Sequence, residues 1–85
     1  MEIQYLPKFE RQYKKLPRDT QEEAERKEKL FRKNPFDPKL KTHKLGGQLS
    51  GFWAFSVTHS CRIIFEFADN DVVRFYKIGP HDIYK

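Results

Sequence analysis

The C-terminal half of the chain collects the residue types that acid–base chemistry on a phosphodiester requires. Attack of a ribose 2′-OH on the adjacent phosphate needs a base, an acid and a cation, but no metal. Histidine suits proton transfer because its unperturbed pKa is about 6.5. Arginine donates paired hydrogen bonds to phosphate, and tyrosine offers a stacking face to an unpaired base. These types fit cleavage of RNA, and the candidates are His43, His59, Arg62, His81 and Tyr84.

The same residues give little support to other chemistry. The histidine positions, 43, 59 and 81, match no metal-binding spacing such as H-x-x-x-H, so we expect neither a metal nor another cofactor. Cys61 is the only cysteine, which excludes an intramolecular disulfide. Its place in an apolar strand indicates a buried structural thiol rather than an activated nucleophile.

Each candidate also has an ordinary structural explanation. Arg62 could form an ion pair with Glu66 or Asp71 instead of meeting a substrate. His59 falls in a hairpin turn, where a solvated polar side chain is the usual finding, and His43 lies in a glycine-containing loop. The two candidates nearest the C-terminus fall where chains are often disordered. The sequence leaves these alternatives open.

The charge distribution favours an anionic partner. The 85 residues carry a formal net charge of +5 with a pI near 9.4, and basic chains of this kind suit polyanions. Acidic and basic residues largely cancel in the first 34 residues, whereas no acid occurs between Pro38 and Phe65. Three lysines and one arginine fall in that acid-free segment: Lys39, Lys41, Lys44 and Arg62.

The length predicts one domain over residues 1–85, because a chain this short supports a single small core. The N-terminus has neither the charged region nor the long apolar run of a signal peptide. No apolar segment approaches the roughly 20 residues that cross a bilayer. We therefore expect a cytoplasmic protein that does not associate with membranes.

A small sheet and two helices must position the candidate residues. Apolar alternation predicts four strands, and apolar spacings of three and four predict two helices joined to the later strands by a long loop. The ranges are 2–6, 52–57, 61–67 and 72–78 for the strands and 34–50 for the loop. The helices are 7–16 and a second one that Asp19 or Thr20 caps and that ends at Lys33. The last strands pair antiparallel because their connections are short. This order predicts an α+β fold of two layers, with both N-terminal helices packed on one face of an antiparallel sheet.

The whole chain resembles the RelE/ParE superfamily of bacterial toxins from type II toxin–antitoxin pairs. The element order strand–helix–helix–strand–strand–strand is similar to the RelE-like fold. LSGFW at 49–53, followed by CRIIFEF, resembles the YoeB toxins, and IGPHDIYK at 78–85 resembles the YafQ branch. LPRDTQEE and KNPF fit the same pattern.

The resemblance implies a metal-independent endoribonuclease without cofactors that cleaves mRNA in the ribosomal A site, inhibits translation and arrests growth. It also implies a cognate antitoxin as a protein partner, together with mRNA and the ribosome. By the same resemblance His43 is the candidate base, Arg62 the ligand of the scissile phosphate, and His81 the candidate acid or phosphate ligand. Tyr84 resembles the C-terminal aromatic residue of these toxins. The expected substrate-binding residues are Lys41, Lys44, His59 and Lys85.

Departures from the superfamily pattern keep two other functions open. RelE carries two lysines where this chain has Trp53 and Phe55, and YafQ carries a histidine and an aspartate where it has Ser56 and Ser60. A ParE-like inhibitor of DNA gyrase has the same fold and no need for the histidines. A non-catalytic RNA-binding relative would fit the missing lysines.

Overall fold

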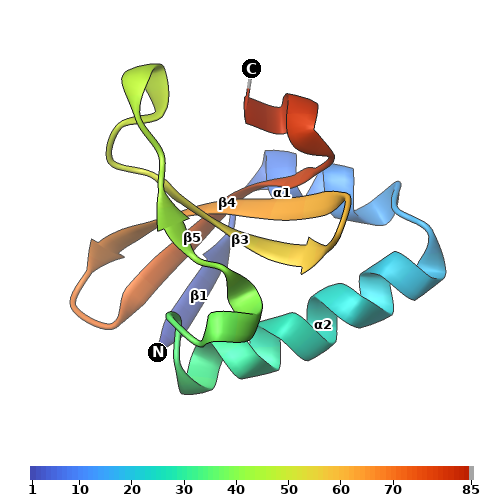
Figure 1. Cartoon of the computed structure of the whole chain (residues 1–85), viewed down its shortest axis with the longest axis horizontal. Coiled ribbons are helices and arrows are strands. Elements are labelled where there is room, and N and C mark those ends of the chain that lie inside the picture. The colour runs from blue at the N-terminus through green and yellow to red at the C-terminus, as the bar shows by residue number, and fades with distance from the viewer. Residues whose placement is uncertain (85) are drawn as a thin grey trace.

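The computed structural model describes residues 1–84 and, for His81, the backbone alone. Two α-helices follow the first strand, and a sheet formed largely by the C-terminal half completes the molecule (Figure 1). The elements are β1 (Glu2–Tyr5), α1 (Pro7–Lys14), α2 (Arg18–Lys33), β2 (His43–Lys44), β3 (Trp53–Thr58), β4 (Cys61–Asp69) and β5 (Val72–Gly79), with 3₁₀ turns η1 (Pro38–Leu40), η2 (Gly47–Leu49) and η3 (His81–Tyr84).

The sheet has the strand order β1-β5-β4-β3-β2. Strands β3, β4 and β5 pair antiparallel, as predicted, because only two residues separate each from the next. Strand β1 joins the other edge of β5 in parallel, with Ile3 opposite Val73. The predicted α+β fold is confirmed, and the parallel edge strand is the one departure from an all-antiparallel sheet. No local pattern in the sequence indicates that pairing, because 66 residues lie between the two strands.

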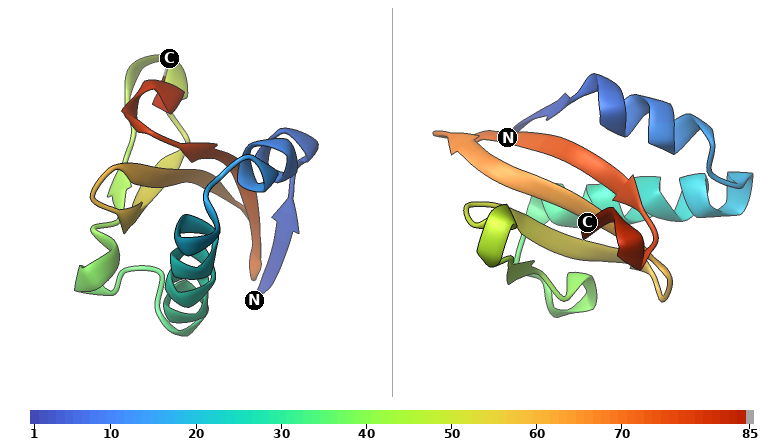
Figure 2. Two further views of the ribbon diagram at one scale, coloured as in Figure 1. Left: turned by 90° about the vertical axis from the view of Figure 1, so that its right-hand side faces the viewer. Right: turned by 90° about the horizontal axis from the view of Figure 1, so that it is seen from above.

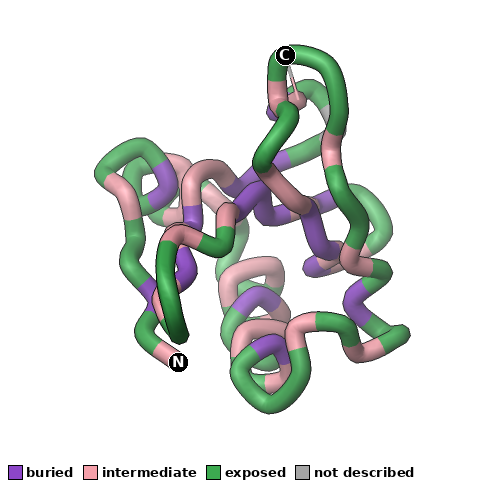
Figure 3. Tube along the Cα trace, turned by 90° about the vertical axis from the view of Figure 1, so that its left-hand side faces the viewer, coloured by how far each residue is buried: buried purple, intermediate pink, exposed green. Residues whose placement is uncertain are grey.

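Both helices cover one face of the sheet, and the core lies between the helices and that face (Figure 2). Phe31 of α2 is fully buried at its centre, with its ring 4.9 Å from those of both Phe55 and Phe65. Phe9 of α1 packs against Phe75 at 5.5 Å. Figure 3 shows the buried stretches concentrated in the strands, with exposed loops around them. The large aromatic side chains therefore build the core on the helix side of the sheet.

The opposite face of the sheet has a much thinner cover. Ala54 and Ile64 are fully buried there, and Ile83 of η3 is buried at 8% exposure. The views of Figures 1 and 2 place η3 across the sheet from α2. We call this side, which carries no α-helix, the open face.

Two local predictions need correction. Helix α2 begins after Pro17, with no side-chain cap, whereas Asp19 or Thr20 was expected to cap it. The Asp19 carboxylate instead accepts a hydrogen bond from the Thr20 amide at 2.9 Å. The segment 34–50 was expected to be an unstructured loop, but it contains η1, β2 and η2. These elements have two or three residues each, which is too short for a periodic signal.

None of the helices in the described part of the chain combines the length and the apolar character that crossing a membrane requires.

The core position of Phe31 gives a test of this packing. We expect Phe31→Ala to lower the free energy of unfolding by about 3–5 kcal/mol, because the removed ring leaves a cavity that its neighbours cannot fill. Phe36→Ala is the matched control, since that ring is 53% exposed and contacts the rings of Trp53, edge to face, and Phe67, stacked, near the surface. The control should lose at most about 1.5 kcal/mol. Denaturant titration measures both values, and equal losses would contradict the assignment of Phe31 as the core centre.

Candidate active site

The strand register brings candidate residues together on the open face. Ser56 of β3 lies opposite Arg62 of β4, which in turn lies opposite Gly79 of β5. One row along the strands, His43 lies opposite Ala54, which pairs with Ile64. Paired residues in an antiparallel ladder share a face, and so do residues two apart on one strand. From the spacings of strands and residues, the Cα atoms of His43 and Arg62 are about 12 Å apart, so both side chains can reach one nucleotide.

Arg62 is held by the turn that joins β3 to β4. Its Nη1 atom donates hydrogen bonds to the backbone carbonyls of Thr58 at 2.9 Å, His59 at 3.2 Å and Cys61 at 3.4 Å. The alternative ion pairs do not form: Glu66 pairs with Arg74 at 3.2 Å, and Asp71 pairs with the N-terminal amine at 3.0 Å. The guanidinium is therefore fixed by neutral carbonyls, and no carboxylate of the described residues cancels its positive charge.

His43 is exposed on β2, and one ring nitrogen is already engaged. Nδ1 lies 3.0 Å from the backbone carbonyl oxygen of Lys41. Because a carbonyl can only accept, Nδ1 carries the proton of this hydrogen bond. In the neutral ring Nε2 then keeps its lone pair, which is the state that a general base needs.

A cationic notch of about 220 Å³ lies beside Arg62, at the part of the β3 edge that β2 does not cover. Among the described side chains that line it, none is acidic. Lys27 reaches it from α2, where its ammonium donates to the Val57 carbonyl at 3.0 Å and pairs with Glu23 at 3.1 Å. The notch is lined by Lys27, Lys39, Lys41, Ser56, Val57, Thr58, His59 and Arg62. Three expected site residues, Lys41, His59 and Arg62, thus meet in one place.

Two cations of the notch were absent from the expected site. Lys39 belongs to the acid-free segment that the sequence reveals, so its charge signal was present. Lys27 gives no such signal, because it stands in a helix of alternating charges and lies 30 residues from Val57 in the chain. Only the packing of α2 on β3 brings Lys27 to this edge.

Lys44 lies apart from the other expected residues. It is paired with Trp53, whose ring packs against the core on the helix side of the sheet. The Lys44 ammonium stands 5.4 Å from the centre of that ring, which is the distance of a cation–π contact. The one-residue step from His43 to Lys44 moves the side chain to the opposite face of the sheet.

The C-terminal candidates are positioned through η3. Gly79 ends β5 opposite Arg62, and η3 begins two residues later at the backbone of His81. Ile83 anchors the turn in the open face, and Tyr84 follows it half-buried. The expected roles of the His81 side chain and of Lys85 lie outside the described residues.

Lys77 is a further cation on the open face that the sequence analysis missed. It pairs with Ile64 in the same row as His43. Burial lowers the pKa of its ammonium, and the neighbouring charge of Lys8 lowers the pKa further. Its ammonium lies 3.5 Å from the Ile83 carbonyl oxygen. Lys77 therefore adds a cation between the sheet and η3.

Cys61 is a buried thiol, as predicted. Its exposure is 5%, and burial raises the pKa of the thiol, so the reactive thiolate is disfavoured. In the part of the chain that the structure describes, no three histidine, cysteine, aspartate or glutamate side chains gather as ligands for a metal.

Sequence comparison decides the family. A profile described as the bacterial toxin of type II toxin–antitoxin system, YafQ, matches residues 1–84. The chain belongs to this family of toxins. The expected membership of the RelE/ParE superfamily, close to YafQ and YoeB, is thereby confirmed. Comparison with curated protein sequences gives no significant match.

Solved structures of related toxins share the fold of this YafQ-family chain. YafQ from E. coli strain BL21(DE3) has a TM-score of 0.80 at 20% identity, with 98% of this chain and 96% of that chain covered. The YoeB/ParE toxin from Agrobacterium tumefaciens has a TM-score of 0.81 at 15% identity, with 95% and 99% covered. YafQ in the E. coli DinJ–YafQ toxin–antitoxin complex has a TM-score of 0.77 at 20% identity, with 96% and 93% covered.

The close approach of η3 to Gly79 gives a test of how the site is positioned. A Cβ atom at Gly79 would stand 2.7 Å from Cγ2 of Ile83, so Gly79→Ala should push η3 off the sheet. We expect a loss of roughly 1–3 kcal/mol in unfolding free energy and faster amide exchange at residues 82–84. Gly46→Ala is the control, because nothing lies within 4 Å of its added Cβ. Unchanged exchange in Gly79→Ala would show that η3 is not held by this contact.

Proposed function

We propose that this YafQ-family toxin is an endoribonuclease that cleaves mRNA in the ribosomal A site. The reaction is attack of the ribose 2′-OH on the adjacent phosphate. The observation that carries the proposal is the arrangement on the open face. There the register aligns His43 and Arg62 with the strand end from which η3 departs, beside a notch lined without acids. That arrangement suits a polyanion that must be positioned and then deprotonated.

Proton transfer is divided between two histidines in this proposal. Nε2 of His43 takes the proton of the 2′-OH, since its Nδ1 is occupied by the Lys41 carbonyl. The 2′-oxygen then bonds to phosphorus, and the bond from phosphorus to the 5′-oxygen breaks. His81 donates a proton to the departing 5′-oxygen, and Tyr84 stacks on the neighbouring base. The products are a 2′,3′-cyclic phosphate and a 5′-hydroxyl, and no metal takes part.

Arg62 retains the donors that a phosphate needs. A guanidinium has five N–H groups, and the carbonyls of the β3–β4 turn engage Nη1 alone among the described contacts. Nε–H and the two protons on Nη2 remain for paired hydrogen bonds to the phosphate oxygens. The turn carbonyls fix the plane of the fork before the substrate arrives, which favours stabilisation of charge in the transition state.

A cognate antitoxin is the protein partner in this proposal. Related toxins have been solved as the DinJ–YafQ complex from E. coli and as the YoeB–YefM complex from Staphylococcus aureus. We infer the same kind of pairing for this chain because it shares their fold over more than nine-tenths of its length. In this proposal the protein acts in the cytoplasm, where its substrate, mRNA, and the ribosome are found.

The proposal is tested by inducing the wild-type chain and His81→Ala in bacteria and mapping the 5′ ends of cellular mRNA. We expect new 5′-hydroxyl ends inside reading frames with the wild type. His81→Ala and His43→Ala should each lower cleavage by about 100-fold or more, because each removes a proton-transfer group. Growth arrest with intact mRNA and damaged DNA would overturn the ribonuclease and favour a gyrase inhibitor.

Two controls separate chemistry from folding and charge. Lys29→Ala removes an exposed cation on α2, outside the notch and the open face, and should cleave like the wild type. Circular dichroism melting curves report the folding of both histidine variants, and the curve of His43→Ala should match the wild type because His43 is exposed. Purified enzyme should cleave synthetic RNA free of ribosomes equally with and without EDTA. Loss of cleavage in EDTA would contradict the metal-independent mechanism.

A further inference from the structure

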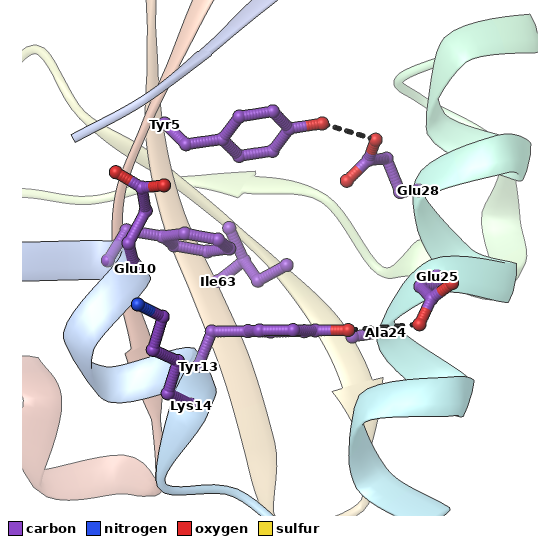
Figure 4. A pocket seen from close by; sticks show the side chains of 9 residues that line it. Tyr5, Glu10, Tyr13, Lys14, Ala24, Glu25, Glu28 and Ile63 are labelled. Atoms are coloured by element: carbon purple, nitrogen blue, oxygen red, sulfur yellow. Dashed lines mark hydrogen bonds between the residues drawn. The ribbon is translucent and has the colours of Figure 1, made fainter. Parts of the chain in front are cut away.

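A second cavity lies on the helix side of the molecule, away from the candidate active site. It has a volume of about 300 Å³, at the lower end of the range for ligand pockets. Its apolar wall comes from three elements and includes Phe9 of α1, Ala24 of α2 and Ile63 of β4. The side chains of Tyr5 and Tyr13 both extend across it toward α2, one above the other (Figure 4). We call this cavity the tyrosine slot.

Each tyrosine of the slot ends on a carboxylate of α2. The Tyr5 hydroxyl donates to Oε2 of Glu28 at 2.6 Å, and the Tyr13 hydroxyl donates to Oε2 of Glu25 at 3.0 Å. Burial and the neighbouring Glu25 raise the pKa of Tyr13 to about 12, and burial with Glu28 raises the pKa of Tyr5. Both phenols thus stay protonated and hold the carboxylates at the slot.

The slot differs in charge from the rest of the toxin. Three carboxylates line it, and the cations beside them are Lys14, which lines it, and Arg32, whose Nη2 lies 3.4 Å from Oε2 of Glu28. In a chain with a net charge of +5 this is a local excess of acid. In the described part of the chain, no hydrogen bond engages Oε1 of Glu25 or Glu28. Two negative acceptors therefore remain at the end of an apolar, aromatic slot.

We propose that the tyrosine slot receives a basic side chain, an arginine in the best fit, from a protein partner of the toxin. The Phe9 ring packs against both tyrosine rings, at 5.8 Å from Tyr5 and 6.2 Å from Tyr13. The methylene stem would lie on this apolar wall, the guanidinium would lie against the face of one tyrosine ring, and its protons would point toward Oε1 of the two glutamates. Arginine is among the residues that contribute most to protein interfaces. The partner is the antitoxin, so this step rests on the proposed function.

The lining of the slot favours a basic side chain over a small free cation. A small free cation has few apolar atoms to set against the apolar wall, so it would be held by little more than the two carboxylates. A side chain delivered by a folded partner arrives already positioned, so it avoids part of the entropic cost of binding. A partner side chain in the slot would bind on the helix side and would not cover His43 and Arg62, which lie on the open face.

The test uses N-acetylarginine amide as the probe and N-acetylcitrulline amide, its neutral isostere, as the matched ligand. Both are titrated into the full chain labelled with ¹⁵N, and amide shifts are followed by NMR. We expect the arginine probe to shift amides at Tyr5, Tyr13 and the Glu25–Glu28 turn, and the citrulline probe to bind about tenfold more weakly. Equal binding of the two probes, or shifts confined to other surfaces, would overturn the proposal.

Isosteric variants locate the binding in the slot. Glu25→Gln with Glu28→Gln keeps an acceptor for each tyrosine but removes both charges, and should weaken the arginine probe by about tenfold or more. Glu22→Gln, on the same helix but outside the slot, should leave it unchanged. Unaltered affinity in the double variant would overturn the slot as the binding place.

A second pair of titrations identifies the occupant. Putrescine binding more tightly than the arginine probe would make a free amine the occupant and overturn the role of a partner. With the purified toxin–antitoxin complex, the arginine probe should no longer shift the slot amides; continued binding would also overturn that role. None of these measurements uses RNA cleavage. Absence of nuclease activity would therefore leave this result standing, and a failed titration would leave the nuclease standing.

Discussion

Burial of the Phe31 ring is the constraint that orders the molecule. The ring is fully buried against those of Phe55, Phe65 and Phe75, so α2 must lie across the sheet at this level. A chain of 85 residues supports only one large core. With most of the large aromatic side chains gathered on the helix side, the opposite face receives Ala54, Ile64, the ring pair of Phe52 and Tyr76 at 5.0 Å, and one turn. The open face is thin because the core is one-sided, and polar side chains can stand on it beside the strands.

The open face obtains its order from the register of the strands rather than from packing. Ser56, Arg62 and Gly79 are neighbours because three strands pair without gaps at that row. The absence of a side chain at Gly79 lets Ile83 approach, which fixes where η3 begins. Arg62 gains its orientation from carbonyls of a two-residue turn, and those carbonyls need a donor in return. The hydrogen bonds that satisfy the turn carbonyls are thus the same ones that orient the Arg62 guanidinium.

Local patterns predicted the element types, the helix side and the buried thiol, because each depends on residues close together in the chain. The parallel pairing of β1 and the reach of Lys27 to the β3 edge depend on residues 70 and 30 positions apart, which no local period encodes. Lys44 shows the opposite difficulty. Its charge was plain in the sequence, but a two-residue strand decides its face, and β2 is too short to show alternation. The basic residues were thus easier to find than to place.

The notch at the β3 edge and the tyrosine slot carry opposite local charges. Lysines, an arginine and a histidine surround the notch at the β3 edge without a lining acid, whereas Glu10, Glu25 and Glu28 line the tyrosine slot. Lys27 and Glu28 are adjacent on α2, but Lys27 lines the notch and Glu28 lines the slot. Successive side chains of a helix point in different directions, so one helix supplies a cation to one site and an acid to the other. In the two proposals, a polyanion and a basic partner segment therefore each meet a surface of complementary charge on this small protein.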